Sequence, residues 1–96
     1  MVQVCTEISV AGFNNAEITE GLQDFLAELS ERPWLINPRA EWDAARTLLL
    51  VTVQTEGNNP KLESVSVLDE VWNCVIACFD FASEISFNIE EAKLIP

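Results

Sequence analysis

The longest periodic apolar segment, residues 62–82, constrains the fold of this sequence more than any other feature. Apolar residues recur in it every three or four positions, a spacing that places them on one face of an α-helix. They are Leu62, Val65, Leu68, Trp72, Val75, Phe79 and Ala82, and Glu63, Ser66, Glu70, Asn73, Ala77 and Asp80 share the opposite face. Because further apolar residues widen the apolar face, this helix needs a broad packing partner, and we expect that partner to be a sheet.

A shorter helix is expected from Asn14 to about Arg32. Asn14 followed by Glu17 is typical of a capping box, and Pro33 ends the helix because it cannot continue the hydrogen-bond pattern. Its core stripe is Ile18, Leu22, Phe25, Leu26 and Leu29. Gly21 weakens the helix, which suggests that another backbone comes close there.

Four other segments predict strands. Residues 2–10 alternate, with Val4, Thr6 and Ile8 on the face to be buried, and residues 47–55 and 85–90 alternate in the same way. The segment around residues 34–42 is irregular, and Pro38 within it favours an edge strand because proline cannot donate a hydrogen bond. Residues 43–46 form a short hairpin loop.

The resulting order, β-α-β-β-α-β, fits an α+β, ferredoxin-like (split βαβ) two-layer sandwich. Its four-stranded antiparallel sheet has the order 4-1-3-2, with two helices on one face. The 96 residues fit one α+β domain over 1–96, in which 91–96 either continue the last strand with a bulge or form a loose tail.

Charge restricts the partners. The chain has 5 basic and 16 acidic residues, a net charge of −11. Such a protein is repelled by nucleic acid and by anionic membranes, which basic residues normally bind. No apolar run is long enough to span a bilayer, no signal peptide is recognisable, and three cysteines suit a reducing cytoplasm. We expect a soluble cytoplasmic protein with a basic protein partner, although acidity can also serve solubility alone.

The expected acidic docking face lies on the first helix, with no Lys or Arg among its members. It comprises Glu17, Glu20, Asp24, Glu28 and Glu31. Like charges three or four residues apart destabilise a helix slightly, so such a row suits electrostatic docking, although a merely solvated face is the simpler interpretation. Acidic inhibitors and toxin-neutralising immunity proteins use similar surfaces against basic enzymes, an analogy of charge and size only.

The open face of the predicted sheet is a second candidate surface. Alternation places Leu48, Leu50 and Thr52 there, beside Gln3, Cys5 and Glu7. Two leucines within a polar face suggest a homodimer or a small-molecule-binding regulatory domain, and ordinary exposure explains them equally well.

No catalytic constellation is recognisable, so an enzyme is not expected. The sequence has no His and no Tyr, which removes the usual proton shuttles. Cys74 and Cys78 lack further ligands at metal-binding spacing and are interpreted as buried apolar residues, so neither a metal nor a cofactor is predicted. Trp72 is assigned to the core, whereas one of Trp34 and Trp42 is expected to be exposed and to anchor a partner.

Overall fold

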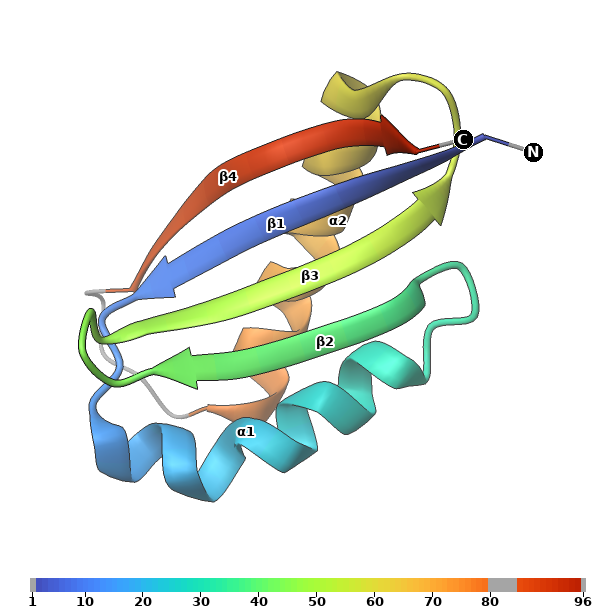
Figure 1. Ribbon diagram of the computed structural model, residues 1–96. Helices are drawn as coiled ribbons and strands as arrows, with labels where there is room; N and C mark the ends of the chain where they lie inside the picture. Colours follow the sequence, from blue (N-terminus) through green and yellow to red (C-terminus); the bar gives the residue numbers. More distant parts are fainter. Residues whose placement is uncertain (1, 80–84, 96) are drawn as a thin grey trace.

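The computed structural model describes residues 2–79 and 85–95. Across these residues, four antiparallel strands form one sheet, with two helices on the same side of it (Figure 1). The elements in chain order are β1 (Gln3–Ala11), α1 (Asn15–Ser30), β2 (Ile36–Asp43), β3 (Leu48–Glu56), α2 (Pro60–Cys78) and β4 (Ser86–Ile95). The predicted ferredoxin-like α+β arrangement is confirmed.

The sheet order β2-β3-β1-β4 confirms the predicted order. β1 lies in the centre and pairs with β3 and β4 along its whole length, from Gln3 opposite Glu56 and Ile95 to Ala11 opposite Leu48 and Ser86. β2 is an edge strand that pairs only with β3 within the described residues. Its register is irregular between Ile36 and Arg39, where Asn37 has a φ of 50° and Pro38 follows, so the edge assignment is correct.

The core lies between the sheet and the helices. From the strands, Ile8, Val10, Leu49, Val51 and Val53 are buried, in agreement with the alternation of the sequence. α1 packs on β2 and on α2, and α2 packs on β1 and β4. Within the described residues, neither helix is long and apolar enough to cross a membrane.

α1 begins with the predicted capping box. The backbone N–H of Glu17 donates to Asn14 Oδ1 over 2.9 Å, and the Asn14 N–H donates to Glu17 Oε1 over 3.1 Å. Gly21 is buried against the ring of Phe79, where a side-chain carbon would have no room. Gly21 therefore lies at a close approach, but an aromatic side chain makes it and not the predicted backbone.

β4 extends through the predicted tail to Ile95, and the bulged alternative is the one observed. The β1–β4 register passes from Glu7–Glu91 to Ile8–Ile89, which leaves Glu90 without an opposite residue. The Glu90 carboxylate accepts hydrogen bonds from Ser9 Oγ and Asn88 Nδ2, each of 2.6 Å. These bonds, that from Ser9 foremost, hold the pKa of Glu90 below its ordinary value.

The face of α2 that meets the sheet differs from the predicted one. The buried residues of the helix are Ser64, Val67, Val71, Cys74 and Val75. Of the predicted core stripe, Val75 and Phe79 are buried and Leu68 is half-buried, but Leu62, Val65 and Trp72 are exposed. Assigning those three to the core was wrong. The helix also ends at Cys78, with Phe79 extended, and Ala82 lies outside the described residues.

Side-chain size explains this rotation. The apolar sector of α2 is wider than the side that meets the sheet, so hydrophobic periodicity does not single out which part of it is buried. Short side chains such as Ser64, Val67 and Cys74 let the helix axis come close to the sheet, while the larger Leu62 and Trp72 would hold it away. The close-packed arrangement leaves the bulky residues outside.

Two valines on the same helix test this rotation. Val67→Ala removes two methyl groups from the core and should lower the free energy of unfolding by about 2 kcal/mol. Val65→Ala, at an exposed position two residues away, should change it by less than about 0.5 kcal/mol. Urea denaturation measures both, and equal losses at the two positions would contradict the observed orientation.

The bulge predicts a pH dependence. Ser9→Ala removes a hydrogen bond to the Glu90 carboxylate, so the pKa of Glu90 should rise toward its ordinary value. Because the folded-state pKa is depressed, the bond stabilises the protein above the unfolded-state pKa, and the stabilisation is lost as the pH falls through the folded-state pKa. NMR titration of Glu90 measures the shift. Ser86→Ala, a serine of β4 without a hydrogen bond to Glu90, should leave the titration unchanged.

Candidate functional site

The outermost face of α2 is apolar. Leu62, Val65, Trp72 and Ile76 are 65%, 52%, 42% and 51% exposed, respectively. They are spaced three, seven and four residues apart, and Asp69, also exposed, falls in the gap between Val65 and Trp72. These five residues, here called the α2 stripe, follow the spacing with which one helix packs along another.

Within the stripe, Trp72 is the residue that contacts β4. Its ring lies 5.0 Å, centroid to centroid, from the ring of Phe87 on β4, at an interplanar angle of 59°. The tilted contact fixes the orientation of the indole while a large part of it remains at the surface. A rigid, half-exposed indole is the kind of side chain that dominates the energetics of protein interfaces.

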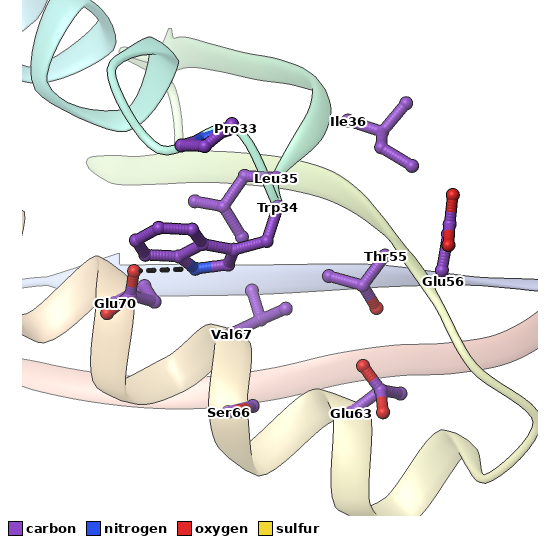
Figure 2. A pocket seen from close by; sticks show the side chains of 10 residues that line it. All are labelled: Pro33, Trp34, Leu35, Ile36, Thr55, Glu56, Glu63, Ser66, Val67 and Glu70. Carbon is purple, nitrogen blue, oxygen red and sulfur yellow. Dashed lines mark hydrogen bonds between the residues drawn. The ribbon is translucent and has the colours of Figure 1, made fainter.

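A pocket of about 330 Å³ lies beside the amino-terminal half of α2. One wall is the α1–β2 connection, the floor is the end of β3, and the other wall is α2 (Figure 2). Its lining residues are Pro33, Trp34, Leu35 and Ile36 from the connection, Thr55 and Glu56 from β3, and Glu63, Ser66, Val67 and Glu70 from α2. Three carboxylates and one indole therefore share a single hollow.

The wall formed by the α1–β2 connection is held in place by contacts of Trp34 and Arg32 with the Glu70 carboxylate. The indole Nε1–H donates to Glu70 Oε2 over 2.9 Å, and Arg32 Nε lies 3.1 Å from the same oxygen. Arg32 also donates from Nη1 to the Glu28 carbonyl of α1 over 2.6 Å, so together with its contact to Glu70 it links the end of α1 to α2. Trp34 is nonetheless 58% exposed, so its ring stands preorganised at the pocket mouth. The expectation that either Trp34 or Trp42 is exposed holds for Trp34, while Trp42 is half-buried and donates to Asn15 Oδ1.

The pocket floor contains an unsatisfied polar group. Thr55 is only 6% exposed, and its hydroxyl has no hydrogen-bond partner. Figure 2 shows this hydroxyl turned toward the α2 side of the pocket, where Glu63 lies. Thr6, on the neighbouring strand β1, carries a second buried hydroxyl without a partner, but Thr6 does not line the pocket. Buried polar groups are nearly always paired, so each such hydroxyl calls for an explanation.

Glu56 and Glu63 carry uncompensated charge. Among the described residues, neither carboxylate forms an ion pair or a hydrogen bond. The Glu63 side chain is tucked against Gly57, where an added side-chain carbon would lie 2.8 Å from both Cδ and Oε2 of Glu63. Gly57, with a φ of 156°, therefore creates the space that Glu63 occupies.

The predicted acidic row on α1 is less uniform than expected. Glu17 belongs to the capping box, and Glu28 lies 3.5 Å from Arg32. No Lys or Arg lies among the members of the row, as the sequence shows, but Arg32, which follows the end of α1, compensates the charge of Glu28. Glu20, Asp24 and Glu31 are exposed and form no ion pair within residues 2–79 and 85–95. They remain the unpaired part of the predicted docking face.

With both helices on one sheet face, the sequence predicts that Glu63, Asp69, Glu70 and Asp80 of the second helix join this row in a single acidic surface, but the structure places these acids elsewhere. Glu63 and Glu70 face the pocket, and Asp69 belongs to the α2 stripe. Asp80 lies outside the described residues. The predicted continuous acidic surface over both helices is thus divided into α1 acids, pocket acids and Asp69.

Of the residues predicted to lie beside Leu48, Leu50 and Thr52 on the open sheet face, only Glu7 is directly opposite one of them, because Gln3 and Cys5 pair with Glu56 and Gln54. Leu48, Leu50 and Thr52 lie on this face and are half-buried, opposite Ala11, Ser9 and Glu7 of β1. On the other side of β3, Leu50 faces Glu41 and Thr52 faces Arg39 of β2. The leucines are therefore enclosed by polar and charged neighbours, and a role in dimerisation stays a prediction.

Cys74 and Cys78 are neighbours on α2, and Cys5 lies apart from them on β1. Cys74 is buried against the sheet, and burial raises the pKa of its thiol to about 11. Burial also raises the pKa of Cys78, with Glu28 and Asp24 adding to the effect. Cys5 lies on the opposite sheet face. No group of three potential metal ligands occurs in residues 2–79 and 85–95.

Sequence reasoning missed both the α2 stripe and the pocket. A signal for the stripe was present, because a helix whose apolar sector is wider than the side that meets a sheet must expose part of that sector. The pocket had no such signal, since its walls come from segments more than twenty residues apart in the chain.

Compared with protein-family models, with curated proteins and with solved structures, the chain matches none of them significantly.

The charges on α1 predict a stability effect. Neutralising Glu20 and Asp24 together, as Glu20→Gln with Asp24→Asn, relieves like-charge repulsion and should raise the free energy of unfolding at low salt by roughly 0.5 kcal/mol. The gain should vanish near about 1 M salt, where surface charges are screened. Glu28→Gln, which breaks the contact with Arg32, should give no gain. Thermal denaturation of the wild type, the double variant and Glu28→Gln at low and high salt measures these effects. Unchanged or lower stability of the double variant at low salt would rule out the repulsion.

Proposed function

We propose that this protein is a non-catalytic interaction module that binds a protein partner through the α2 stripe, and that the partner surface is both apolar and basic. The observation that carries the proposal is the position of Asp69 within an otherwise apolar, exposed helix face. Leu62, Val65, Trp72 and Ile76 supply contact area of the kind that interfaces bury. The Asp69 carboxylate among them determines which partner surfaces can cover these residues.

Asp69 requires a basic counterpart. Covering a carboxylate with an uncharged surface removes it from water without compensation, which is unfavourable. A Lys or Arg of the partner, placed between apolar residues that contact Val65 and Trp72, would pair with it. Such a residue would also fix the register of the two surfaces.

A second copy of the chain is a poor occupant of the stripe. In an antiparallel pair of α2 helices centred on the stripe, Asp69 would face Asp69, and like charges in contact oppose association. The net charge of −11 adds a long-range repulsion between copies, while it attracts a basic partner and speeds its approach. The same charge supports the predicted avoidance of nucleic acid and anionic membranes.

Two further expectations belong to this proposal. Three free cysteines support a reducing compartment, and we place the protein in the cytoplasm. The regulatory homodimer that would use Leu48, Leu50 and Thr52 gains no support, because charged residues of β1 and β2 surround that face.

The test uses two synthetic peptides of identical leucine and lysine composition. One places all its leucines on one helical face, and the other has the same residues in scrambled order. In calorimetric titration, the amphipathic peptide should bind at least about tenfold more tightly, because only it can cover the stripe. Its affinity should fall when salt is raised from about 50 mM to about 500 mM.

Variants locate the surface. Asp69→Asn should weaken binding of the amphipathic peptide by about tenfold, and the double variant Val65→Ser with Ile76→Ser should weaken this binding at least as much. Both changes fall at exposed positions, so the fold should be kept. Leu50→Ser, on the opposite sheet face, is the matched control and should have no effect. Equal binding of the two peptides, or loss of binding in Leu50→Ser alone, would contradict the proposal.

A further inference from the structure

We propose that the pocket between the α1–β2 connection and α2 is a binding site for one lysine side chain of the partner. This inference rests on the proposed function and assigns the chemistry of a second contact beside the α2 stripe. The proposal stands on three observations: an indole fixed at the pocket mouth, unpaired carboxylates, and a buried hydroxyl without a partner.

The indole and the carboxylates suit an aliphatic chain that ends in a cation. Trp34 presents an exposed ring, held by its bond to Glu70, along which methylene groups can pack. Figure 2 shows Glu70 at the end of the pocket beneath the indole, and Glu56 and Glu63 toward the other end. A cation entering past the ring gains a favourable contact with its face before it reaches the unpaired acids.

The arrangement of acceptors favours an ammonium over a guanidinium. Arginine is best bound by one carboxylate that offers both oxygens edge-on to its planar fork. Glu70 is not free for that role, because Arg32 and Trp34 already share its Oε2. The other acceptors that face each other come from separate elements, the Thr55 hydroxyl from β3 and the Glu63 carboxylate from α2, whereas Glu56 points to the other side of β3. A compact ammonium with three donors can bond several such separated acceptors at once.

Thr55 supplies the observation that an acidic cluster alone would lack. Its side chain is more than nine-tenths buried, lines the pocket, and has a hydroxyl with no partner. An ammonium placed between this oxygen and Glu63 would satisfy the hydroxyl and neutralise the carboxylate together. The pocket volume of about 330 Å³ accommodates a lysine side chain.

The test titrates the intact protein with Nα-acetyl-lysine methylamide and follows the Trp34 indole N–H signal by NMR, assigned with Trp34→Phe. The lysine compound should shift this signal in a saturable manner. The norleucine analogue has a similar aliphatic chain without the ammonium and should not shift it. The arginine analogue should bind more weakly than lysine. Equal effects of lysine and norleucine, or tighter binding of arginine, would overturn the assignment.

Two matched pairs of variants test the named groups. Glu63→Gln should weaken lysine binding by about tenfold, whereas Glu91→Gln, which removes one charge on β4 outside the pocket, should weaken it less than about twofold. Thr55→Val should weaken binding several-fold, whereas Thr6→Val should leave it unchanged. Both valine variants delete a buried unpaired hydroxyl, so each should melt no earlier than the wild type. Similar affinities of the Thr55 and Thr6 variants would contradict the role of the Thr55 hydroxyl.

The pocket and the proposed function can fail separately. If the lysine compound binds as expected but neither leucine–lysine peptide binds, the interaction module is wrong and the pocket assignment stands. If the amphipathic peptide binds, and Glu63→Gln and Thr55→Val alter neither peptide nor lysine binding, the pocket assignment is wrong and the proposed function stands.

Discussion

The close packing of α2 against the sheet is the constraint on which the rest of the structure depends. Its buried side is built from short residues, among them Ser64, Val67 and Cys74, which allow the helix to approach β1 and β4. Protein interiors tolerate few voids, so the rotation that brings short side chains inward is favoured even when larger apolar ones are available. That rotation turns Leu62 and Trp72 outward and Glu63 and Glu70 toward the α1–β2 connection. The stripe and one wall of the pocket are both consequences of it.

A second interaction joins the two helices and shapes the pocket. Arg32, one residue before the proline that follows α1, reaches Glu28 on its own helix and Glu70 on α2. Because Glu70 also accepts from Trp34, the same carboxylate secures the end of α1 and the orientation of the indole. An ion pair at the surface contributes little to stability by itself. Its larger effect here is positional, since it holds a bulky ring at the pocket mouth.

Function, in this interpretation, is distributed over surfaces that differ in chemistry. The α1 acids and the overall charge act at long range, the α2 stripe offers apolar contact with one carboxylate in its centre, and the pocket offers acceptors around an aliphatic channel. Each of these favours a basic and partly apolar protein surface, and the repulsion between acidic copies disfavours self-association. The unpaired hydroxyl of Thr55 and the uncompensated Glu63 have a common explanation if a cation completes the pocket.

The sequence by itself determined the elements and their order. Local chemistry is enough to predict the capping box at Asn14 and Glu17, the alternation over β1 and β3, and the edge position implied by Pro38. The order of the elements, combined with the crossover rule, is enough to predict the sheet topology. Only the tertiary structure decided which side of α2 is buried, which acids remain unpaired, and where a pocket forms. Periodicity cannot choose the buried side within an apolar sector as wide as that of α2, and the partner of a charge such as Arg32 is set by distance in space. The candidate site depends on contacts between distant segments, and these exist only once the helices have settled on the sheet.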